Sequence, residues 1–220
     1  MIIATIPLKK HRNDDCLITM QGVFTNDAIW RAWQHPRNKL GRFAKKGFED
    51  ITDEWLKNIK KGKYIKAQVI EIDGEPIFIN GTDYKATGIR IKFEHTLRER
   101  YIGWKLNKDY GMEIIENPEV KQPIRHPMAD FTTNENEPLE LKSPRDALRM
   151  KWGDKNPFKE LIKHKLRQSD TFVFDITTDR TTKELSVYWV NDIFNDDDYE
   201  SVKRCLIMTN GRIYKMLARK

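Results

Sequence analysis

The sequence predicts an α/β protein with a mixed central sheet flanked by helices, preceded by a small, basic α+β module. The hydrophobic pattern of residues 93–176 changes period in the order helix, strand, strand, strand, helix, strand. Residues 171–176 form a nearly continuous apolar run, which is typical of a strand buried on both faces. We place the boundary near residue 88, so the module covers residues 1–88 and the larger domain covers residues 89–220.

The N-terminal module is predicted from short apolar runs separated by turn residues. Two strands are expected at residues 2–6 and 16–24, and Asn26 is a candidate cap for the helix that follows. A second helix is expected to begin near Thr52, and Asp73-Gly74 predicts the turn of a hairpin over residues 64–79.

The larger domain is predicted from helical periodicity, caps and turn pairs. Residues 93–109 have the pattern of an amphipathic helix in which Leu97, Tyr101 and Trp104 share a face, and tryptophans such as Trp104 are expected in the core or in domain contacts. Gly111 suits the left-handed residue that ends a helix. Further elements are three strands at 112–116, 123–131 and 138–142, helices at 157–168 (capped by Asp154 or Asn156) and 184–194, and a hairpin at 204–217 with Asn210-Gly211 as its turn.

Composition indicates a basic protein with polyanionic partners. The 220 residues carry a net charge of +7, most of it contributed by the first 90 residues, which favours nucleic acid as a partner. No apolar run is long enough to span a membrane, and the first basic residues follow the apolar start instead of preceding it, unlike a signal peptide. We therefore expect no membrane association. The sequence has only two cysteines, Cys16 and Cys205, and they lack metal-ligand spacing, so we expect a reducing, cytoplasmic compartment.

The candidate catalytic residues are Asp130 and the triplet Glu140-Leu141-Lys142. Glu140 and Lys142 alternate along an extended segment, so both side chains point to one face of a strand. Asp130 can come alongside from the neighbouring strand, which would bring two carboxylates and one ammonium together. This set can hold a divalent cation and position a water for attack on a phosphodiester. The alternative is a solvated strand face with a weak ion pair.

This order of elements, with Asp130 at the second strand and Glu140-x-Lys142 on the third, resembles the PD-(D/E)XK nuclease superfamily over roughly residues 90–217. Within it, the chain is most similar to the CdiA C-terminal toxin nucleases of contact-dependent inhibition systems, whose relatives include polymorphic and phage-borne toxins. Gln168-Ser169 stands where such domains end the helix that follows the motif. The resemblance implies a restriction-endonuclease-like fold for residues 89–220.

The resemblance also implies roles for individual residues. Asp130, Glu140 and the Leu141 carbonyl would bind Mg²⁺ or Mn²⁺, which prefer oxygen ligands. Lys142 would orient the attacking water and stabilise the developing charge. The remaining roles are a further carboxylate from the helix and contacts to substrate or water, assigned to Glu94, Lys165 and Gln168.

Each of these assignments has an alternative. A different strand register would let Glu135 or Glu137 replace a metal ligand. Glu94 would otherwise be an exposed acid near the start of a helix, and Lys165 and Gln168 would be surface residues.

Residues 35–47 form a basic stretch with Gly and Pro and no acidic side chain, which predicts an exposed loop. Its cations could neutralise phosphates while one aromatic ring stacks on a base, and the alternative is a solvated flexible loop. The candidate nucleic-acid-binding residues of this stretch are Arg37, Lys39, Arg42, Phe43, Lys45 and Lys46.

The function predicted from the sequence is metal-dependent phosphodiester hydrolysis in tRNA or DNA by a toxin or phage-encoded effector. A CdiA-like nuclease implies a small acidic immunity protein that blocks the basic cleft. Two alternatives stay open: a non-catalytic nucleic-acid-binding protein with a nuclease fold, and a structural protein of a virion.

Overall fold

The computed structural model describes residues 46–72, 75–78, 90–122, 128–133, 136–144, 156–177 and 181–220. By its internal contacts the chain divides into two units, Met1–Ala44 and Lys45–Lys220. The strands expected at residues 2–6 and 16–24 and the helix after Asn26 lie outside the described residues.

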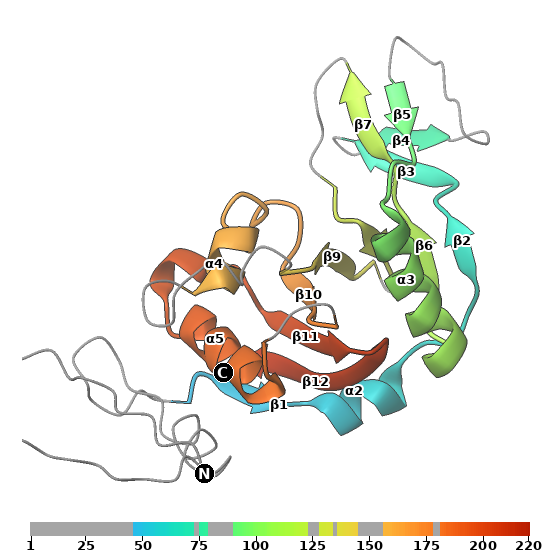
Figure 1. Ribbon diagram of the computed structural model, residues 1–220. Coiled ribbons are helices and arrows are strands. Elements are labelled where there is room, and N and C mark those ends of the chain that lie inside the picture. Colours follow the sequence, from blue (N-terminus) through green and yellow to red (C-terminus); the bar gives the residue numbers. More distant parts are fainter. Residues whose placement is uncertain are drawn as a thin grey trace, which may run out of the picture. The chain divides into compact units, whose positions relative to one another are not determined.

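The described strands form an eight-stranded mixed sheet with the order β1-β12-β11-β10-β9-β8-β6-β2 (Figure 1). Three central strands, β9, β10 and β11, are parallel, whereas β8 is antiparallel to both of its neighbours. At the edges, β2 pairs with β6 in parallel and β1 pairs with β12 antiparallel. The bounds are β1 Phe48–Asp50, β2 Tyr64–Lys66, β6 Ile114–Glu116, β8 Phe131–Thr132, β9 Pro138–Lys142, β10 Thr171–Asp175, β11 Arg204–Thr209 and β12 Arg212–Arg219.

Every residue of β10 is buried, as the apolar run predicted. The pattern follows from position, because a parallel strand in the middle of a sheet is covered on both faces. The hairpin of β11 and β12 is also confirmed. Its turn residues Asn210 and Gly211 have positive φ angles of 50° and 67°, as a tight turn of the primed type requires.

Four α-helices and one 3-10 helix accompany the sheet in the described part of the chain. Helix α3 packs against β2 and β6, α5 packs against β11, β12 and α4, and α2 packs against β12. Their bounds are α2 Thr52–Asn58, α3 Leu97–Tyr110, α4 Pro157–Ile162, α5 Lys183–Phe194 and η2 Asp197–Tyr199. None of these helices has the length and apolarity to cross a bilayer.

Local sequence explains where the helices begin and end. Thr96 caps α3 in a reciprocal capping box with Glu99, and Gly111 ends the helix with a φ of 70°. Asn156 caps α4 through a hydrogen bond from the Phe158 N–H at 3.0 Å, and the alternative cap Asp154 lies outside the described residues. Helix α4 ends at Ile162, six residues earlier than expected, and residues 163–168 continue the chain as turns.

Two further sheets have two strands each. The Asp73-Gly74 pair separates β3 (Val69–Ile72) from β4 (Glu75–Phe78), which pair antiparallel, so the hairpin prediction is confirmed for these strands. Strand β5 (Arg90–Lys92) pairs antiparallel with β7 (Glu119–Gln122).

Residues 48–66 differ most from the expected organisation. Strand β2 does not extend the hairpin; it pairs with β6, and β1 pairs with β12. These segments therefore complete the large sheet, and the chain divides after Ala44 instead of near residue 88. The physical reason is that both strands supply backbone partners for sheet edges that would otherwise be unpaired.

The side of α3 that packs against the sheet also differs from the expected one. Leu97, Tyr101 and Trp104 do share a face, but all three side chains are exposed. The buried residues of the helix are Ile102, Gly103 and Leu106. Gly103 is needed there, because a Cβ at this position would lie 2.9 Å from the ring of Tyr64 and 3.0 Å from that of Phe131. The helix thus approaches the sheet through its smallest residue.

Candidate active site on the β8–β9 hairpin

The β8–β9 hairpin brings Asp130 and Glu140 together. Phe131 pairs with Leu139 and Thr132 with Pro138, so Asp130 lies opposite Glu140, one step beyond the last pair of the register. The Asp130 carboxylate accepts a hydrogen bond from the Leu141 N–H at 2.8 Å. The second expected strand begins only at Phe131, so Asp130 stands at its start, and residues 123–127 lie outside the described residues.

Glu140 is buried and lies among cations. Lys142 donates a hydrogen bond to Glu140 Oε1 at 2.6 Å, and the Lys165 Nζ atom is 3.4 Å from the same oxygen. The pairing of Glu140 with Lys142 follows from strand alternation, whereas Lys165 comes from the turns after α4. The other oxygen, Glu140 Oε2, is buried and has no hydrogen-bond partner among the described residues.

Asp130 has an unusually high pKa for a carboxyl group. Burial is the largest cause and the nearby Glu140 carboxylate adds to it, whereas Lys142 and the Leu141 N–H oppose the shift, with a resulting pKa of about 7. Two carboxylates therefore share a site in which one of them is only partly ionised at neutral pH. A cation placed between these two groups would favour the ionised form of Asp130.

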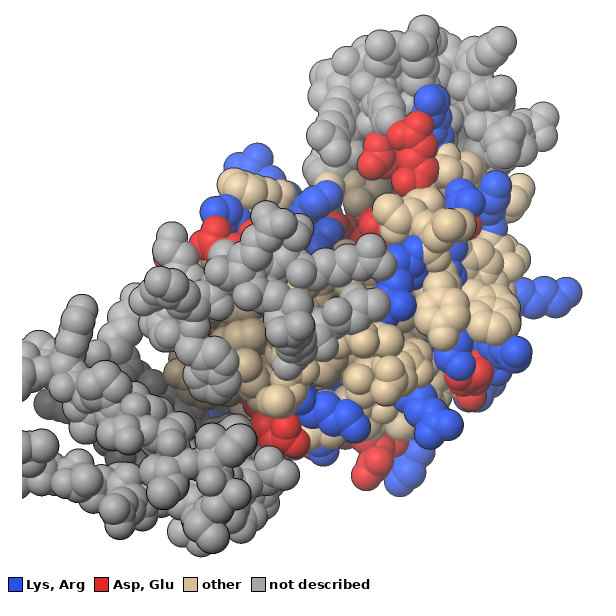
Figure 2. All heavy atoms as spheres, in the orientation of Figure 1, with Lys and Arg blue, Asp and Glu red and all other residues tan. Residues whose placement is uncertain are grey.

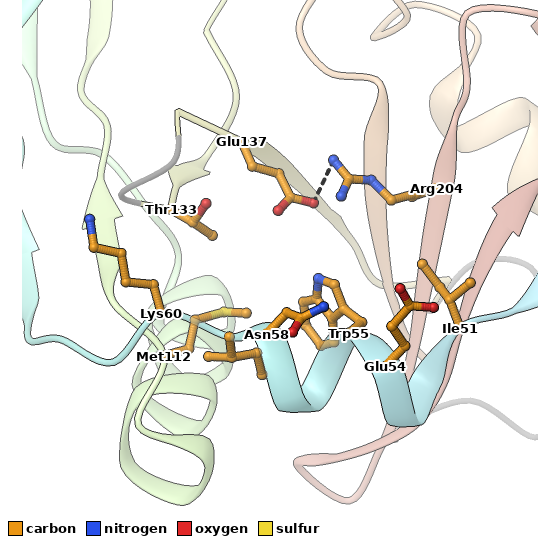
Figure 3. A pocket seen from close by; sticks show the side chains of 10 residues that line it. Ile51, Glu54, Trp55, Asn58, Lys60, Met112, Thr133, Glu137 and Arg204 are labelled. Atoms are coloured by element: carbon orange, nitrogen blue, oxygen red, sulfur yellow. Dashed lines mark ion pairs between the residues drawn. The ribbon is translucent and has the colours of Figure 1, made fainter.

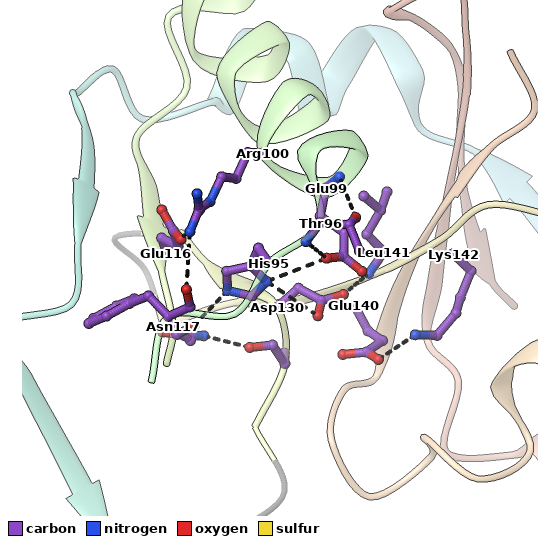
Figure 4. Close-up of polar contacts among 12 residues, drawn as sticks. His95, Thr96, Glu99, Arg100, Glu116, Asn117, Asp130, Glu140, Leu141 and Lys142 are labelled. Carbon is purple, nitrogen blue, oxygen red and sulfur yellow. Dashed lines mark hydrogen bonds and ion pairs between the residues drawn. The ribbon is translucent and has the colours of Figure 1, made fainter. Parts of the chain in front are cut away.

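Two residues that the sequence argument did not select, His95 and Glu99, lie beside Asp130 (Figure 4). The His95 Nδ1 atom is 3.8 Å from Glu99 Oε2 and 3.8 Å from Asp130 Oδ1. His95 Nε2 is 2.6 Å from the Asn117 carbonyl oxygen, and the imidazole stacks on Phe131 with a centroid distance of 5.3 Å. His95 therefore lies near two carboxyl groups through Nδ1, contacts a carbonyl through Nε2 and packs on Phe131 through its ring face.

The charges of this group support one another. Burial works to lower the pKa of His95, but the nearby Glu99 carboxylate, the hydrogen bond with the Asn117 carbonyl and the charge of Asp130 raise it above its ordinary value. Burial works to raise the pKa of Glu99, but His95 and both groups of Thr96 lower it to about 2. The two carboxyl groups beside His95 therefore favour its protonated form, and His95 in turn favours the ionised form of Glu99.

Glu94 does not take the place that the resemblance implied. It precedes α3, is exposed and pairs with Lys92 at 2.9 Å. Glu99, in the first turn of the helix, is the carboxylate that faces Asp130. The Thr96-x-x-Glu99 capping box could have revealed it, because a reciprocal cap fixes the direction of the glutamate side chain.

Asn117 holds the backbone around Asp130. This buried side chain donates to the Ala129 carbonyl at 2.9 Å and to Thr132 Oγ1 at 2.7 Å, and the Asn117 N–H donates to the Asp130 carbonyl at 3.1 Å. No feature of the sequence marked Asn117, because its partners become neighbours only when β6 pairs with β8.

The other candidate site residues that the structure describes do not lie together. Gln168 ends the turns after α4, and its amide oxygen is buried without a hydrogen-bond partner among the described residues. Lys46 is exposed, with its Nζ atom 4.7 Å from the Phe48 ring centroid. The residues that lie outside the described part are Arg37, Lys39, Arg42, Phe43, Lys45 and Glu135.

Glu137, the alternative ligand, is engaged elsewhere. It forms an ion pair with Arg204 at 2.8 Å, at the turn end of the same hairpin. Both residues line a cavity of about 240 Å³ between this turn and α2, together with Trp55 and Thr133 (Figure 3). None of the residues that line this cavity is Asp130, Glu140 or Lys142.

Asp130 and Glu140 are the two carboxylates of this site that could hold a metal ion. The described residues contain no group of three or more His, Cys, Asp or Glu side chains arranged to hold a metal ion. A hard cation such as Mg²⁺ needs fewer than three protein side chains, because it keeps several water ligands and binds through one or two carboxylates. The buried, unpartnered Oε2 atom of Glu140 and the raised pKa of Asp130 both fit such an ion.

Comparison with known proteins adds no relative. No protein-family model, curated protein or solved structure matches the chain.

Proposed function

We propose that this protein is a metal-dependent nuclease of the PD-(D/E)XK type. The observation that carries the proposal is the position of Asp130 opposite Glu140, with Lys142 on the same face and a buried carboxylate oxygen that lacks a partner among the described residues. The chain order α3, β6, β7, β8, β9, α4, β10 supports it, because it follows the order expected from the resemblance apart from β7, which pairs with β5 outside the large sheet.

The protein's own groups would divide the work. Asp130 and Glu140 would hold Mg²⁺ or Mn²⁺, and the bound ion would polarise the phosphoryl group and lower the pKa of a water ligand. Lys142, whose Nζ atom is 2.6 Å from Glu140 Oε1, would orient the water and stabilise negative charge that develops on phosphate. Lys165 adds a second cation at the same carboxylate. His95 would keep Asp130 in position through its 3.8 Å contact.

The test is a cleavage assay on tRNA, single-stranded DNA and duplex DNA, each with EDTA, Mg²⁺ or Mn²⁺. We expect cleavage that requires metal and that Glu140→Gln reduces by at least about 10³-fold, because this variant keeps the side-chain volume and removes the charge. Glu200→Gln, at an exposed glutamate that follows η2, is the matched control and should cleave like the wild type. Equal cleavage by both variants would contradict the site, and binding without cleavage would favour the non-catalytic alternative.

The toxin or phage context and the acidic immunity partner rest on the resemblance alone and stay predictions of the sequence.

A further inference from the structure

An exposed apolar face runs along α3. Leu97, Tyr101 and Trp104 are 87%, 41% and 44% exposed, and they are three of the four large hydrophobic residues that the described part of the chain exposes. Their spacing of four and three residues places them on one side of the helix. The rings of Tyr101 and Trp104 lie 6.1 Å apart at an angle of 36°, so they form a nearly continuous aromatic surface.

Cations surround this surface. The Nζ atoms of Lys108 and Lys105 lie 4.4 Å and 6.0 Å from the Trp104 ring centroid, and the Arg98 guanidinium lies 5.7 Å from that of Tyr101. Lys105 also pairs with Asp109, and Arg98 pairs with the buried Asp175. Figure 2 shows Lys and Arg side chains interspersed with uncharged surface over α3.

Aromatic rings flanked by cations match the chemistry of a nucleic acid strand. Bases stack on aromatic side chains, and lysines at the edge of the rings neutralise the phosphates that connect those bases. Such stacking needs a free base face, which unpaired nucleotides offer and the interior of a duplex does not. The charge favours a polyanion over a neutral apolar partner, as does the net charge of +7.

The surface belongs to the same helix as Glu99 but to its other side. Positions 99 and 104 differ by a rise of roughly 7.5 Å and a rotation of about 140°, at 1.5 Å per residue and 3.6 residues per turn, so the aromatic rings face solvent while Glu99 faces Asp130.

We propose that the Tyr101–Trp104 surface of α3 binds unpaired bases of a nucleic acid, with Lys108 and Lys105 at its phosphates. The substrate class is therefore a single strand or the loop of a folded RNA, and an uninterrupted duplex is excluded from this surface. The use of the surface in cleavage rests on the proposed nuclease function, whereas binding does not require cleavage.

The test measures binding of the full chain in EDTA by fluorescence anisotropy, with a single-stranded oligonucleotide, a duplex of equal length and an RNA hairpin. Trp104→Ala should weaken binding of the single strand and the hairpin by about 10-fold, whereas Trp104→Phe should restore most of it. Lys108→Gln should lower the slope of log affinity against log salt by about one. Ile65→Ala removes an exposed hydrophobic residue outside α3, and Lys57→Gln removes a lysine on α2, so both should bind like the wild type.

Unchanged binding in both Trp104→Ala and Tyr101→Ala would overturn the proposal and would leave a protein partner as the occupant of this face. Equal losses for duplex and single strand would also overturn it. Circular dichroism melting verifies that each variant folds. If Trp104-dependent binding occurs but no metal supports cleavage, the nuclease proposal fails and this one stands. If Glu140-dependent cleavage persists in Trp104→Ala and the affinity for single strands is unchanged, the binding proposal fails and the nuclease proposal stands.

Discussion

The two ends of the β8–β9 hairpin both carry a carboxylate, and they differ in how its charge is balanced. At the turn end, Glu137 pairs with Arg204 at 2.8 Å. At the other end, Asp130 and Glu140 face each other, and burial together with their mutual repulsion raises the pKa of Asp130 to about 7. One end resembles a structural ion pair, whereas the other gathers two carboxyl groups among Lys142, Lys165 and His95, and one of these carboxyl groups is only partly ionised at neutral pH. Perturbed groups of this kind are enriched at functional sites.

The largest expected effect separates the two ends by activity. Asp130→Asn should lower metal-dependent cleavage by at least about 10³-fold, because it removes one of two carboxylates available to the ion. Glu137→Gln should stay within a few-fold of the wild type. The cleavage rates of both variants are measured under single-turnover conditions with saturating Mg²⁺. Comparable losses at the two positions would mean that the hairpin as a whole, and not the Asp130 end, supports activity.

Lys142→Ala should have the next largest effect. Its ammonium contacts Glu140, so its loss should reduce the rate by about 10²-fold or more if it stabilises developing charge, while cation binding is retained. Lys163→Ala is the control, since Lys163 pairs with Glu160 on the exposed side of α4. Cleavage rate and Mn²⁺ binding by calorimetry distinguish loss of chemistry from loss of metal, and a variant that loses both would assign Lys142 a structural role.

The raised pKa of Asp130 makes cation binding depend on pH. A folded-state pKa of about 7, above the ordinary 3.8, disfavours the ionised carboxylate in the fold, so the free energy of unfolding falls as pH rises between these values. A bound cation reverses this penalty. Mn²⁺ should therefore raise the melting temperature more at pH 8 than at pH 5.5, and Asp130→Asn should abolish most of the difference. An equal shift at both pH values would contradict the coupling.

Glu99 should respond in the opposite direction. Its pKa is lowered from 4.5 to about 2, so its stabilising contribution is present above pH 4.5 and is lost as pH falls towards 2. Glu99→Gln should flatten the acid limb of stability in this window, measured by urea unfolding at several pH values. Glu184→Gln, a first-turn glutamate of α5, is the control and should leave that limb unchanged.

The smallest effect concerns the cap that orients Glu99. Thr96→Ala should reduce the free energy of unfolding by about 1 kcal/mol, because the Glu99 N–H loses its side-chain partner at 3.2 Å. Thr182→Ala, at the equivalent position of α5, should cost a similar amount. Only Thr96→Ala should also weaken cleavage. If both caps affect cleavage equally, general stability and not the orientation of Glu99 is responsible.

Most local structure of the second unit could be predicted from the sequence. The strands expected at 138–142 and 171–176, the helix expected at 184–194 and the hairpin expected at 204–217 are present within one or two residues of these bounds, and they follow from apolar periodicity, caps and the Asn210-Gly211 turn. Asp130, Glu140 and Lys142 could also be predicted as neighbours, because alternation along a strand and a short hairpin are local properties.

Only the tertiary structure decided which surfaces meet. Periodicity showed that Leu97, Tyr101 and Trp104 share a face but not that Gly103 is on the side that packs, because close approach depends on Tyr64 and Phe131 from other elements. The choice of Glu99 over Glu94, the contact of His95 and the support from Asn117 likewise depend on where α3 and β6 lie against β8. The sequence by itself indicated the central strands, the helices and three groups of the site, Asp130, Glu140 and Lys142. Long-range pairing determined their neighbours, since strand partners distant in the chain leave no local pattern.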